Sequence, residues 1–281
     1  MKIVSLNGQR IEGPLPLDAA DRGLTLGDGL FETLLVVNGA ALWRNMHLAR
    51  LEVSALELGI PYDADQTSTA VDAILDGCGP AHHVLRLTLT RGSGARGLAG
   101  NTAAPTLMCT LEPFDPALMF QPATLFTSSI RRSQDSVAAR MKTLSYIDNI
   151  AAAREAASHG ADDALMLNTS GKPVCTTIAN LFLLKKNKLL TPARDQGILT
   201  GVTRQALIAA AQHIGILTEE RALTVVDVLR ADGVFLTNSL RLMRPVTSID
   251  RQPVAQASLE SLANALCETA RLQCGRDPRL I

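Results

Sequence analysis

Hairpin signals restrict the fold of this chain more than any other feature of its sequence. Asn38-Gly39 divides the apolar stretch at residues 34–43, and Asn-Gly between two apolar runs is a strong hairpin signal. Residues 164–176 and 181–191 repeat the pattern, each with a polar turn inside it. Hairpins join antiparallel strands, and no Gly-x-Gly-x-x-Gly segment opens a helix after a strand. The sequence therefore argues against a doubly wound parallel sheet.

Helical periodicity alternates irregularly with the strand patterns. We expect helices at residues 46–58, 67–75, 145–159 and 202–214, and further strands at 3–6, 83–90, 106–111, 123–129 and 234–237. This order predicts an α+β or mixed α/β fold. Pro113 and Pro116 mark a linker near the centre of the chain. We therefore expect a smaller N-terminal α+β domain at 1–113, an interdomain linker at 114–121 and a larger C-terminal domain at 122–281.

The composition narrows the class of protein. The 281 residues hold 27 Lys and Arg against 27 Asp and Glu, which argues against a nucleic-acid-binding protein. A hydrophobic fraction of 47% argues against disorder, and no apolar stretch reaches the roughly 20 residues of a membrane span. The first residues resemble a strand and turn rather than a secretory signal, and the five cysteines lack zinc-ligand spacing. We expect a soluble cytoplasmic protein with no metal site and a small-molecule substrate.

Lys142 has the least ordinary surroundings of the six lysines. Four of the others lie at residues 172–188 in expected turns, whereas Lys142 is flanked by apolar residues just before an expected helix. Two interpretations are open. The side chain extends from an apolar edge into water, or it is buried as an amine nucleophile that forms a Schiff base.

Six segments of the chain match known signatures in the order expected for one family. They are residues 21–33, 47–51, 142–149, 179–182, 199–204 and 237–246. Together they resemble the fold-type IV, or class IV aminotransferase, family of pyridoxal 5′-phosphate enzymes. That family includes branched-chain aminotransferases, D-amino acid aminotransferases and 4-amino-4-deoxychorismate lyases. The resemblance implies a two-domain fold like that of D-amino acid aminotransferase and pyridoxal 5′-phosphate as cofactor. It also implies a homodimer, with the site between two domains and completed by a partner loop near residues 91–98.

The resemblance assigns the cofactor to particular residues. Lys142 would carry it covalently, and Arg50, Val202, Thr203 and Ser239 would bind its phosphate. A helix N-terminus offers backbone N–H donors and favours anions, so the start of the helix expected at 202–214 suits a phosphate. An ordinary N-cap is the alternative at that position.

Five further residues are expected around the cofactor ring and the substrate. Tyr146 follows Lys142 by four positions, so both can project from one helical face, and by resemblance its hydroxyl would hydrogen-bond the ring oxygen. Phe31 would line the substrate pocket. Arg91 is also expected at the substrate. Arg241 and Arg244, near the last signature, could bind a substrate carboxylate, and solvated loop arginines are the alternative interpretation for these two.

Cys175 departs from the pattern of the family. By resemblance, an acidic residue at this position pairs with the protonated ring nitrogen of the cofactor and makes the ring a strong electron sink. A neutral thiol holds that proton less well, so we expect a weaker sink or an unusual pair between a thiolate and the protonated ring. A local shift of register could bring in another acid, but no Asp or Glu lies between Asp163 and Asp195.

The loop at residues 91–98 and the signatures at 27–33 and 237–240 look most like those of aminodeoxychorismate lyases. This favours a lyase of folate biosynthesis that releases pyruvate from 4-amino-4-deoxychorismate and leaves 4-aminobenzoate. Aromatisation of the product supplies driving force, so a weak electron sink harms this reaction less than transamination. The alternatives are a transaminase for D-amino acids or branched-chain amino acids, and a non-catalytic protein that has kept the fold.

Overall fold

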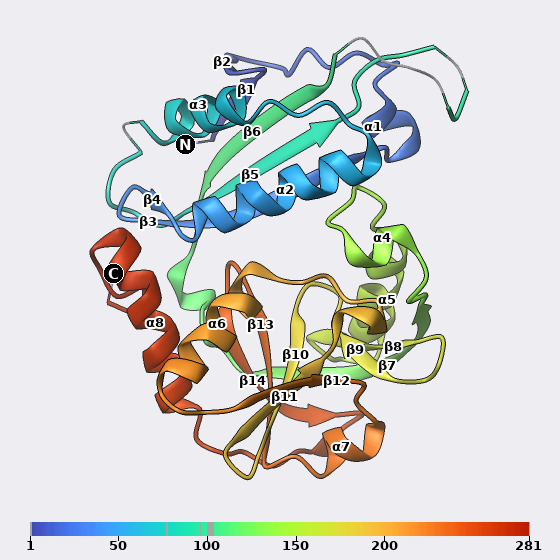
Figure 1. The fold of residues 1–281 in the computed structure, drawn as a ribbon, viewed down its shortest axis with the longest axis vertical. Coiled ribbons are helices and arrows are strands. Elements are labelled where there is room, and N and C mark those ends of the chain that lie inside the picture. The colour runs from blue at the N-terminus through green and yellow to red at the C-terminus, as the bar shows by residue number, and fades with distance from the viewer. Residues whose placement is uncertain (1, 77, 96, 100–103, 281) are drawn as a thin grey trace. The chain divides into compact units, whose positions relative to one another are not determined.

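The computed structural model describes residues 2–76, 78–95, 97–99 and 104–280 (Figure 1). The chain divides into two units, of which unit 1 comprises residues 1–116, 142–145 and 270–281. Unit 2 comprises residues 117–141 and 146–269. The chain therefore returns to unit 1 twice after first leaving it. The linker proposed at 114–121 includes Pro116 and Ala117, where the chain first passes from unit 1 into unit 2.

Unit 1 contains a six-stranded sheet in the order β2-β1-β6-β5-β3-β4. Its strands are β1 (Ile3–Leu6), β2 (Gln9–Arg10), β3 (Gly29–Val37), β4 (Ala40–Ala41), β5 (His83–Thr90) and β6 (Thr106–Pro113). All neighbouring strands run antiparallel. Asn38 and Gly39 both have positive φ in the turn between β3 and β4, which an Asn-Gly pair adopts readily, and the expected hairpin is confirmed.

The described residues of unit 1 include the helices α1 (Arg22–Leu26), α2 (Arg44–Leu58) and α3 (Ala64–Leu75). Gly59 ends α2 with a φ of 63°, and the Asp63 carboxylate caps α3 by accepting from the Gln66 N–H at 2.8 Å. Helix α2 packs on β3, and α3 packs on β6 and β1. The helices expected at 46–58 and 67–75 are confirmed with earlier starts, whereas α1 was not expected.

Unit 2 contains a nine-stranded sheet whose path is β12-β11-β10-β13-β14-β7-β8-β9, with β15 beside β14. Its strands are β7 (Ala123–Arg132), β8 (Asp163–Asn168), β9 (Pro173–Cys175), β10 (Asn180–Lys185), β11 (Lys188–Pro192), β12 (Thr218–Arg221), β13 (Gly233–Asn238), β14 (Leu242–Ile249) and β15 (Gln252–Pro253). Strand β9 also pairs with β10, so six of the strands close into a circuit. The hairpins β8–β9 and β10–β11 are confirmed, but β7 pairs in parallel with both β8 and β14.

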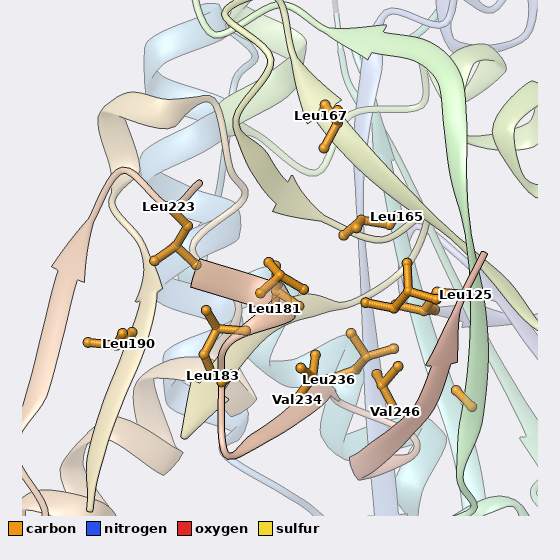
Figure 2. Close-up of a cluster of buried hydrophobic side chains, with 14 residues drawn as sticks. Leu125, Leu165, Leu167, Leu181, Leu183, Leu190, Leu223, Val234, Leu236 and Val246 are labelled. Carbon is orange, nitrogen blue, oxygen red and sulfur yellow. The ribbon is translucent and has the colours of Figure 1, made fainter. Parts of the chain in front are cut away.

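Two apolar clusters hold unit 2 together. Side chains from β7, β8, β10, β13 and β14 meet in one of them, which includes Leu125, Leu165, Leu181 and Leu236 (Figure 2). The other cluster joins Ala152 and Ala156 of α5 to residues of β8 and β9, among them Cys175. Adjacent residues of a strand point to opposite faces, so β8 supplies both clusters.

The helical segments that complete unit 2 are α4 (Val137–Arg140), α5 (Ile147–Ser158), α6 (Val202–His213) and α7 (Val225–Leu229), with 3₁₀ turns at Pro116–Leu118 and Arg194–Gln196. Helix α8 (Glu260–Cys274) begins in unit 2 and ends in unit 1. Neither β14 nor α8 was expected from the sequence. Among the described residues, no helix combines the length and apolar character that crossing a membrane would require.

Candidate functional site

Lys142 lies on an extended segment rather than on a helix. The Lys142 carbonyl accepts from the Phe31 N–H at 2.9 Å, and the Leu144 N–H donates to the Gly29 carbonyl at 2.9 Å. A β-bridge between Leu30 and Thr143 completes this pairing with β3. The approach is close, because a Cβ on Gly29 would lie 2.7 Å from the Leu89 carbonyl oxygen and 2.8 Å from Leu144 Cδ1. The segment is thus held by backbone pairing in unit 1.

The expectation that Lys142 and Tyr146 share a helical face is wrong. Tyr146 is the N-cap of α5, which begins at Ile147, and Lys142 precedes it in the extended segment. Pairing with β3 occupies the backbone groups that a helix starting before Tyr146 would use. The hydrogen bond proposed between the Tyr146 hydroxyl and the ring oxygen of the cofactor stays a prediction, but it cannot rest on a helical face shared with Lys142.

The Lys142 amine contacts an aromatic ring. Its Nζ lies 4.1 Å from the centroid of the Phe31 ring. Burial lowers the pKa of Lys142 to about 8, with Glu32 opposing this shift and the cations Arg50 and Arg86 adding to it. At pH 7 the neutral amine is therefore about 300-fold more abundant than in a lysine with a pKa of 10.5. Lys142 is half-buried, and its lowered pKa supports the interpretation of its amine as a nucleophile.

Glu32 is a buried carboxylate that the sequence analysis did not single out. Its Oε2 accepts from His47 Nδ1 at 2.6 Å, and its two oxygens accept from Arg50 Nε at 2.8 Å and from the second Arg50 nitrogen at 2.6 Å. Burial raises the pKa of Glu32, but Arg50 and the hydrogen bond from His47 outweigh it and bring the pKa to about 2. Burial lowers the pKa of His47 against the opposing effect of Glu32. Glu32 thus fixes the guanidinium of Arg50, the proposed phosphate ligand.

The N-terminus of α6 offers unused donors. The N-cap is Gly201, which has no side chain to cap the helix, and the Thr203 hydroxyl is buried without a hydrogen-bond partner among the described residues. A Cβ on Gly201 would lie 2.1 Å from Asn180 Oδ1, while Asn180 Nδ2 donates to the Leu199 carbonyl at 2.8 Å. The first N–H groups of a helix have no partner within the helix, and they favour an anion. Val202 and Thr203 therefore lie where the sequence analysis expects a phosphate to bind.

Ser239 and Arg241 lie in the turn between β13 and β14. The Asn238 side-chain oxygen shapes this turn by accepting from the N–H groups of Leu240, at 3.1 Å, and Arg241, at 2.8 Å. Arg244 is buried, and it donates to two carbonyls that precede β7, those of Gln121 and Pro122. The roles proposed for Ser239 and Arg241 stay predictions, whereas Arg244 serves to hold the chain before β7.

Cys175 and Asp163 lie in one electrostatic neighbourhood. Burial raises the pKa of the Cys175 thiol, with Arg132 opposing the shift and Asp163 adding to it. This direction favours a thiol over a thiolate at Cys175. Asp163 Oδ1 accepts from Thr177 Oγ1 at 2.6 Å, while its Oδ2 is buried without a partner in the part of the chain that the structure describes. Asp163 stands at the edge of the interval that the sequence analysis found free of acids, and the folded chain brings it near Cys175.

Arg91 donates hydrogen bonds to backbone carbonyls and to a carboxylate. It donates to Asp28 Oδ2 at 2.8 Å and to the carbonyls of Gly59 and Leu58, at 2.7 and 2.8 Å. Arg22 donates to the same Asp28 oxygen at 2.9 Å. These bonds restrict the orientation of the guanidinium, and the role expected for Arg91 at the substrate stays a prediction.

Loop 91–98 is held by the side chain of Arg22. Its guanidinium donates to the carbonyls of Gly97 and Leu98, at 2.7 and 2.8 Å. Arg96, part of the lyase-like segment, lies outside the described residues. The proposal that this loop completes the site of a partner subunit stays a prediction.

Arg86 was also missed by the sequence analysis. Its Cζ lies 4.0 Å from the centroid of the Phe31 ring, which Lys142 also contacts. A charged residue within the apolar strand β3 is a signal that could have identified Glu32. The sequence offers no such signal for Arg86, because polar residues alternate along β5 as they do on any half-exposed strand.

Comparison with known proteins gives consistent results. The family model of amino-transferase class IV matches residues 29–249. A Methanocaldococcus jannaschii protein assigned as a branched-chain-amino-acid aminotransferase is 32% identical over 95% of this chain and 94% of its own. The structure of 4-amino-4-deoxychorismate lyase from Pseudomonas aeruginosa matches with a TM-score of 0.85 and 30% identity, over 94% of this chain and 98% of that one.

A hypothetical aminotransferase from Mycobacterium tuberculosis, in its pyridoxal-phosphate-bound form, matches with a TM-score of 0.87 and 28% identity, over 95% of this chain and 98% of that one. The expected mixed α/β fold of fold-type IV enzymes is confirmed by these structures. The chain belongs to the class IV aminotransferase family, whose cofactor is pyridoxal 5′-phosphate.

Proposed function

We propose that this enzyme is a lyase that converts 4-amino-4-deoxychorismate into 4-aminobenzoate and pyruvate, a reaction of folate biosynthesis. The proposal rests on two separate groups. The pKa of the Lys142 amine is lowered, which makes this amine more reactive, and the pKa of the Cys175 thiol is raised, which keeps the thiol protonated. The first suits proton abstraction at a carbon that bears an amine. The second suits a reaction that depends little on a strong electron sink.

The residues present fit the cofactor. Lys142 supplies a partly neutral amine for the aldehyde, and the buried Thr203 hydroxyl and the start of α6 supply donors for the phosphate. Arg50, fixed by Glu32, supplies a cation of set orientation. When bound, the cofactor supplies an aldehyde that reacts with amines and a ring that withdraws electrons from the neighbouring carbon.

Lys142 would act as the base of the reaction. Its Nζ removes the proton from the ring carbon that carries the amino group. The C–O bond to the enolpyruvyl group then breaks, the ring becomes aromatic, and the enolpyruvate takes up a proton at its methylene carbon to give pyruvate. A base works best when its pKa lies near the working pH, because it must both accept and release a proton. The pKa of Lys142, about 8, meets this requirement.

Cys175 favours the lyase over a transaminase. A carboxylate at this position would hold a proton on the cofactor ring by a charge-assisted hydrogen bond, and a thiol holds it less firmly. Transamination relies on the ring to store the electrons released from the substrate. In the lyase reaction these electrons enter the aromatic ring of the product, so the reaction depends less on the cofactor ring to stabilise them.

A class IV aminotransferase acting on D-amino acids or branched-chain amino acids and a 2-oxo acid is the second candidate. The similarity to the M. jannaschii protein over nearly the whole chain favours it. We also propose a homodimer, as the resemblance to the family implies. The mass of the protein in solution tests this.

The decisive experiment mixes the purified, cofactor-loaded enzyme with 4-amino-4-deoxychorismate and measures 4-aminobenzoate and pyruvate. Equal amounts of both products support the lyase. Absence of 4-aminobenzoate, together with turnover of a D-amino acid or branched-chain amino acid with 2-oxoglutarate, reverses the order of the candidates. Borohydride treatment followed by peptide mapping tests the cofactor link separately, and we expect the label on Lys142.

A further inference from the structure

Thr237 and Asn180 lie side by side on one face of the unit 2 sheet. In the antiparallel pair of β10 and β13, the two residues are directly opposite each other. Directly opposed residues share a face, and their Cβ atoms are about 5 Å apart. Their strand neighbours Leu181 and Leu236 point the other way, into the apolar cluster of Figure 2. Thr237 and Asn180 therefore belong to the face that lies away from this cluster.

The contacts of the Asn180 side chain show what this face meets. Its Nδ2 donates to the Leu199 carbonyl at 2.8 Å, and its Oδ1 lies against Gly201, where a Cβ would collide with it. Helix α6 begins at the next residue, Val202, and packs on β13. The face that carries Asn180 and Thr237 is therefore turned towards the N-terminus of α6.

The hydroxyl of Thr237 is buried in this position without an acceptor. Thr237 is 2% exposed, and its Oγ1 makes no hydrogen bond with any residue that the structure describes. Such a group destabilises a fold, and most buried hydroxyls have a partner. The Thr203 hydroxyl, in the first turn of α6, is buried in the same way. Two hydroxyls from different elements are thus available to an acceptor at the place where the helix presents its first N–H groups.

We propose that the Thr237 hydroxyl donates a hydrogen bond to the phosphate of the cofactor. A phosphate group presents three strong acceptor oxygens, which donors from more than one direction can satisfy. The first turn of α6 supplies donors along the helix axis, and Thr237 supplies one from the strand on which the helix packs. The bond is charge-assisted and therefore stronger than one between neutral groups. The inference rests on the phosphate site proposed at α6, and it holds for the lyase and the transaminase alike.

The test compares the affinity of the apo-protein for pyridoxal 5′-phosphate and for pyridoxal, which lacks the phosphate, by equilibrium dialysis. In Thr237→Val, which keeps the shape of the side chain, we expect the phosphate form to bind at least about tenfold more weakly and pyridoxal to bind as in the wild type. Thr237→Ser keeps the hydroxyl and should bind both compounds as the wild type does. Thermal unfolding should show that apo-Thr237→Val is at least as stable as the wild type, because it loses an unpaired hydroxyl.

Thr218→Val is the matched control. The Thr218 hydroxyl is also buried without a partner among the described residues, but it follows the C-terminal end of α6. The affinity for pyridoxal 5′-phosphate should stay unchanged in this variant. The phosphorus NMR resonance of the bound cofactor gives a second readout, which we expect to move in Thr237→Val and to stay in place in Thr218→Val.

A double variant separates direct contact from an effect through Thr203. If Thr237 contacts the phosphate itself, Thr237→Val should weaken pyridoxal 5′-phosphate further when it is added to Thr203→Val. No further loss, or an equal loss for pyridoxal and its phosphate, would overturn the inference. Binding by Thr237→Ser that is as weak as in Thr237→Val would also overturn it, since the methyl group and not the hydroxyl would then matter. Failure of the proposed function has a different signature, because the wild-type enzyme would then form no 4-aminobenzoate.

Discussion

Glu32 is a charge in the middle of an apolar strand, and the electrostatics of the lysine site depend on it. It is 1% exposed, and so it can stay ionised only because Arg50 and His47 replace the water it has lost. It also opposes the effect of burial on Lys142. One buried carboxylate therefore sets the orientation of an arginine and tunes the protonation of an amine.

We predict that Glu32→Gln lowers the free energy of unfolding by about 3 kcal/mol at pH 7, because it leaves the Arg50 charge without its partner. The pKa of Glu32 in the folded protein, about 2, lies below its ordinary 4.5. Its contribution is therefore complete above pH 4.5 and is lost as the pH falls towards 2. Urea unfolding between pH 2 and 7 should show the gap between wild type and variant closing in that interval.

Glu52→Gln on the exposed side of α2 is the control for this experiment, and it should change stability by less than about 0.5 kcal/mol. The apo-protein gives a second readout, because Glu32→Gln should move the pKa of Lys142 below about 8. A gap between wild type and Glu32→Gln that stays constant from pH 7 to pH 2 would show that Glu32 contributes by packing alone.

At the scale of single residues, the sequence predicts those functional residues that belong to a recognisable local motif. Lys142 could be found because its segment has a recognisable pattern. Glu32 and Arg86 could not be placed beside it, because their relation to Phe31 follows from the register of β3 and β5. Asp163 shows the same limit, since it acts near Cys175 although twelve positions separate them.

At the scale of elements, hairpins and helix ends were predictable because adjacent residues determine them. Asn38-Gly39 and Gly59 are examples, where positive φ marks a turn and a helix end. The parallel pairing of β7 with β14 was not predictable, since a long stretch of the chain with several other strands separates these two in sequence. The shared helical face expected for Lys142 and Tyr146 was wrong for a related reason, because a distant strand holds the segment around Lys142 extended.

The N-terminus of α6 makes a prediction in which stability and binding diverge. In Thr203→Val the lost hydroxyl is buried without a partner, so its removal should leave stability unchanged or raised. A charge-assisted hydrogen bond to phosphate is worth about 1.5–3 kcal/mol, so pyridoxal 5′-phosphate should bind roughly tenfold or more weakly. Pyridoxal, which lacks the phosphate, should bind as before. Equilibrium dialysis of both compounds and thermal unfolding measure these effects.

Thr218→Val is the matched control. Its hydroxyl is also buried without a partner, but it follows the C-terminal end of α6. It should leave the affinity for pyridoxal 5′-phosphate unchanged. Equal loss of affinity for pyridoxal and its phosphate in Thr203→Val would mean that Thr203 supports the site without contacting a phosphate.

At the scale of the whole molecule, the path of the chain couples the two units. Unit 1 is complete only when residues 142–145 and 270–281 return to it, and the whole of residues 146–269 lies between them. If unit 2 unfolds, this segment becomes a flexible loop that unit 1 must close. Closing a loop of that length costs about 4 kcal/mol, a large part of the 5–15 kcal/mol that stabilises a typical domain. The two units should therefore unfold together.

Trp43, the single tryptophan, is buried in unit 1, so its fluorescence reports that unit alone, whereas far-UV circular dichroism reports the helices of both. We predict coincident urea transitions from the two probes. Gln273→Ala removes the side-chain acceptor of the Trp43 backbone N–H. It should lower the free energy of unfolding by about 1 kcal/mol and shift both curves equally. The exposed neighbour Leu272→Ala should shift neither by more than about 0.5 kcal/mol. If only the fluorescence curve moves in Gln273→Ala, the units unfold independently and the chain path provides no coupling.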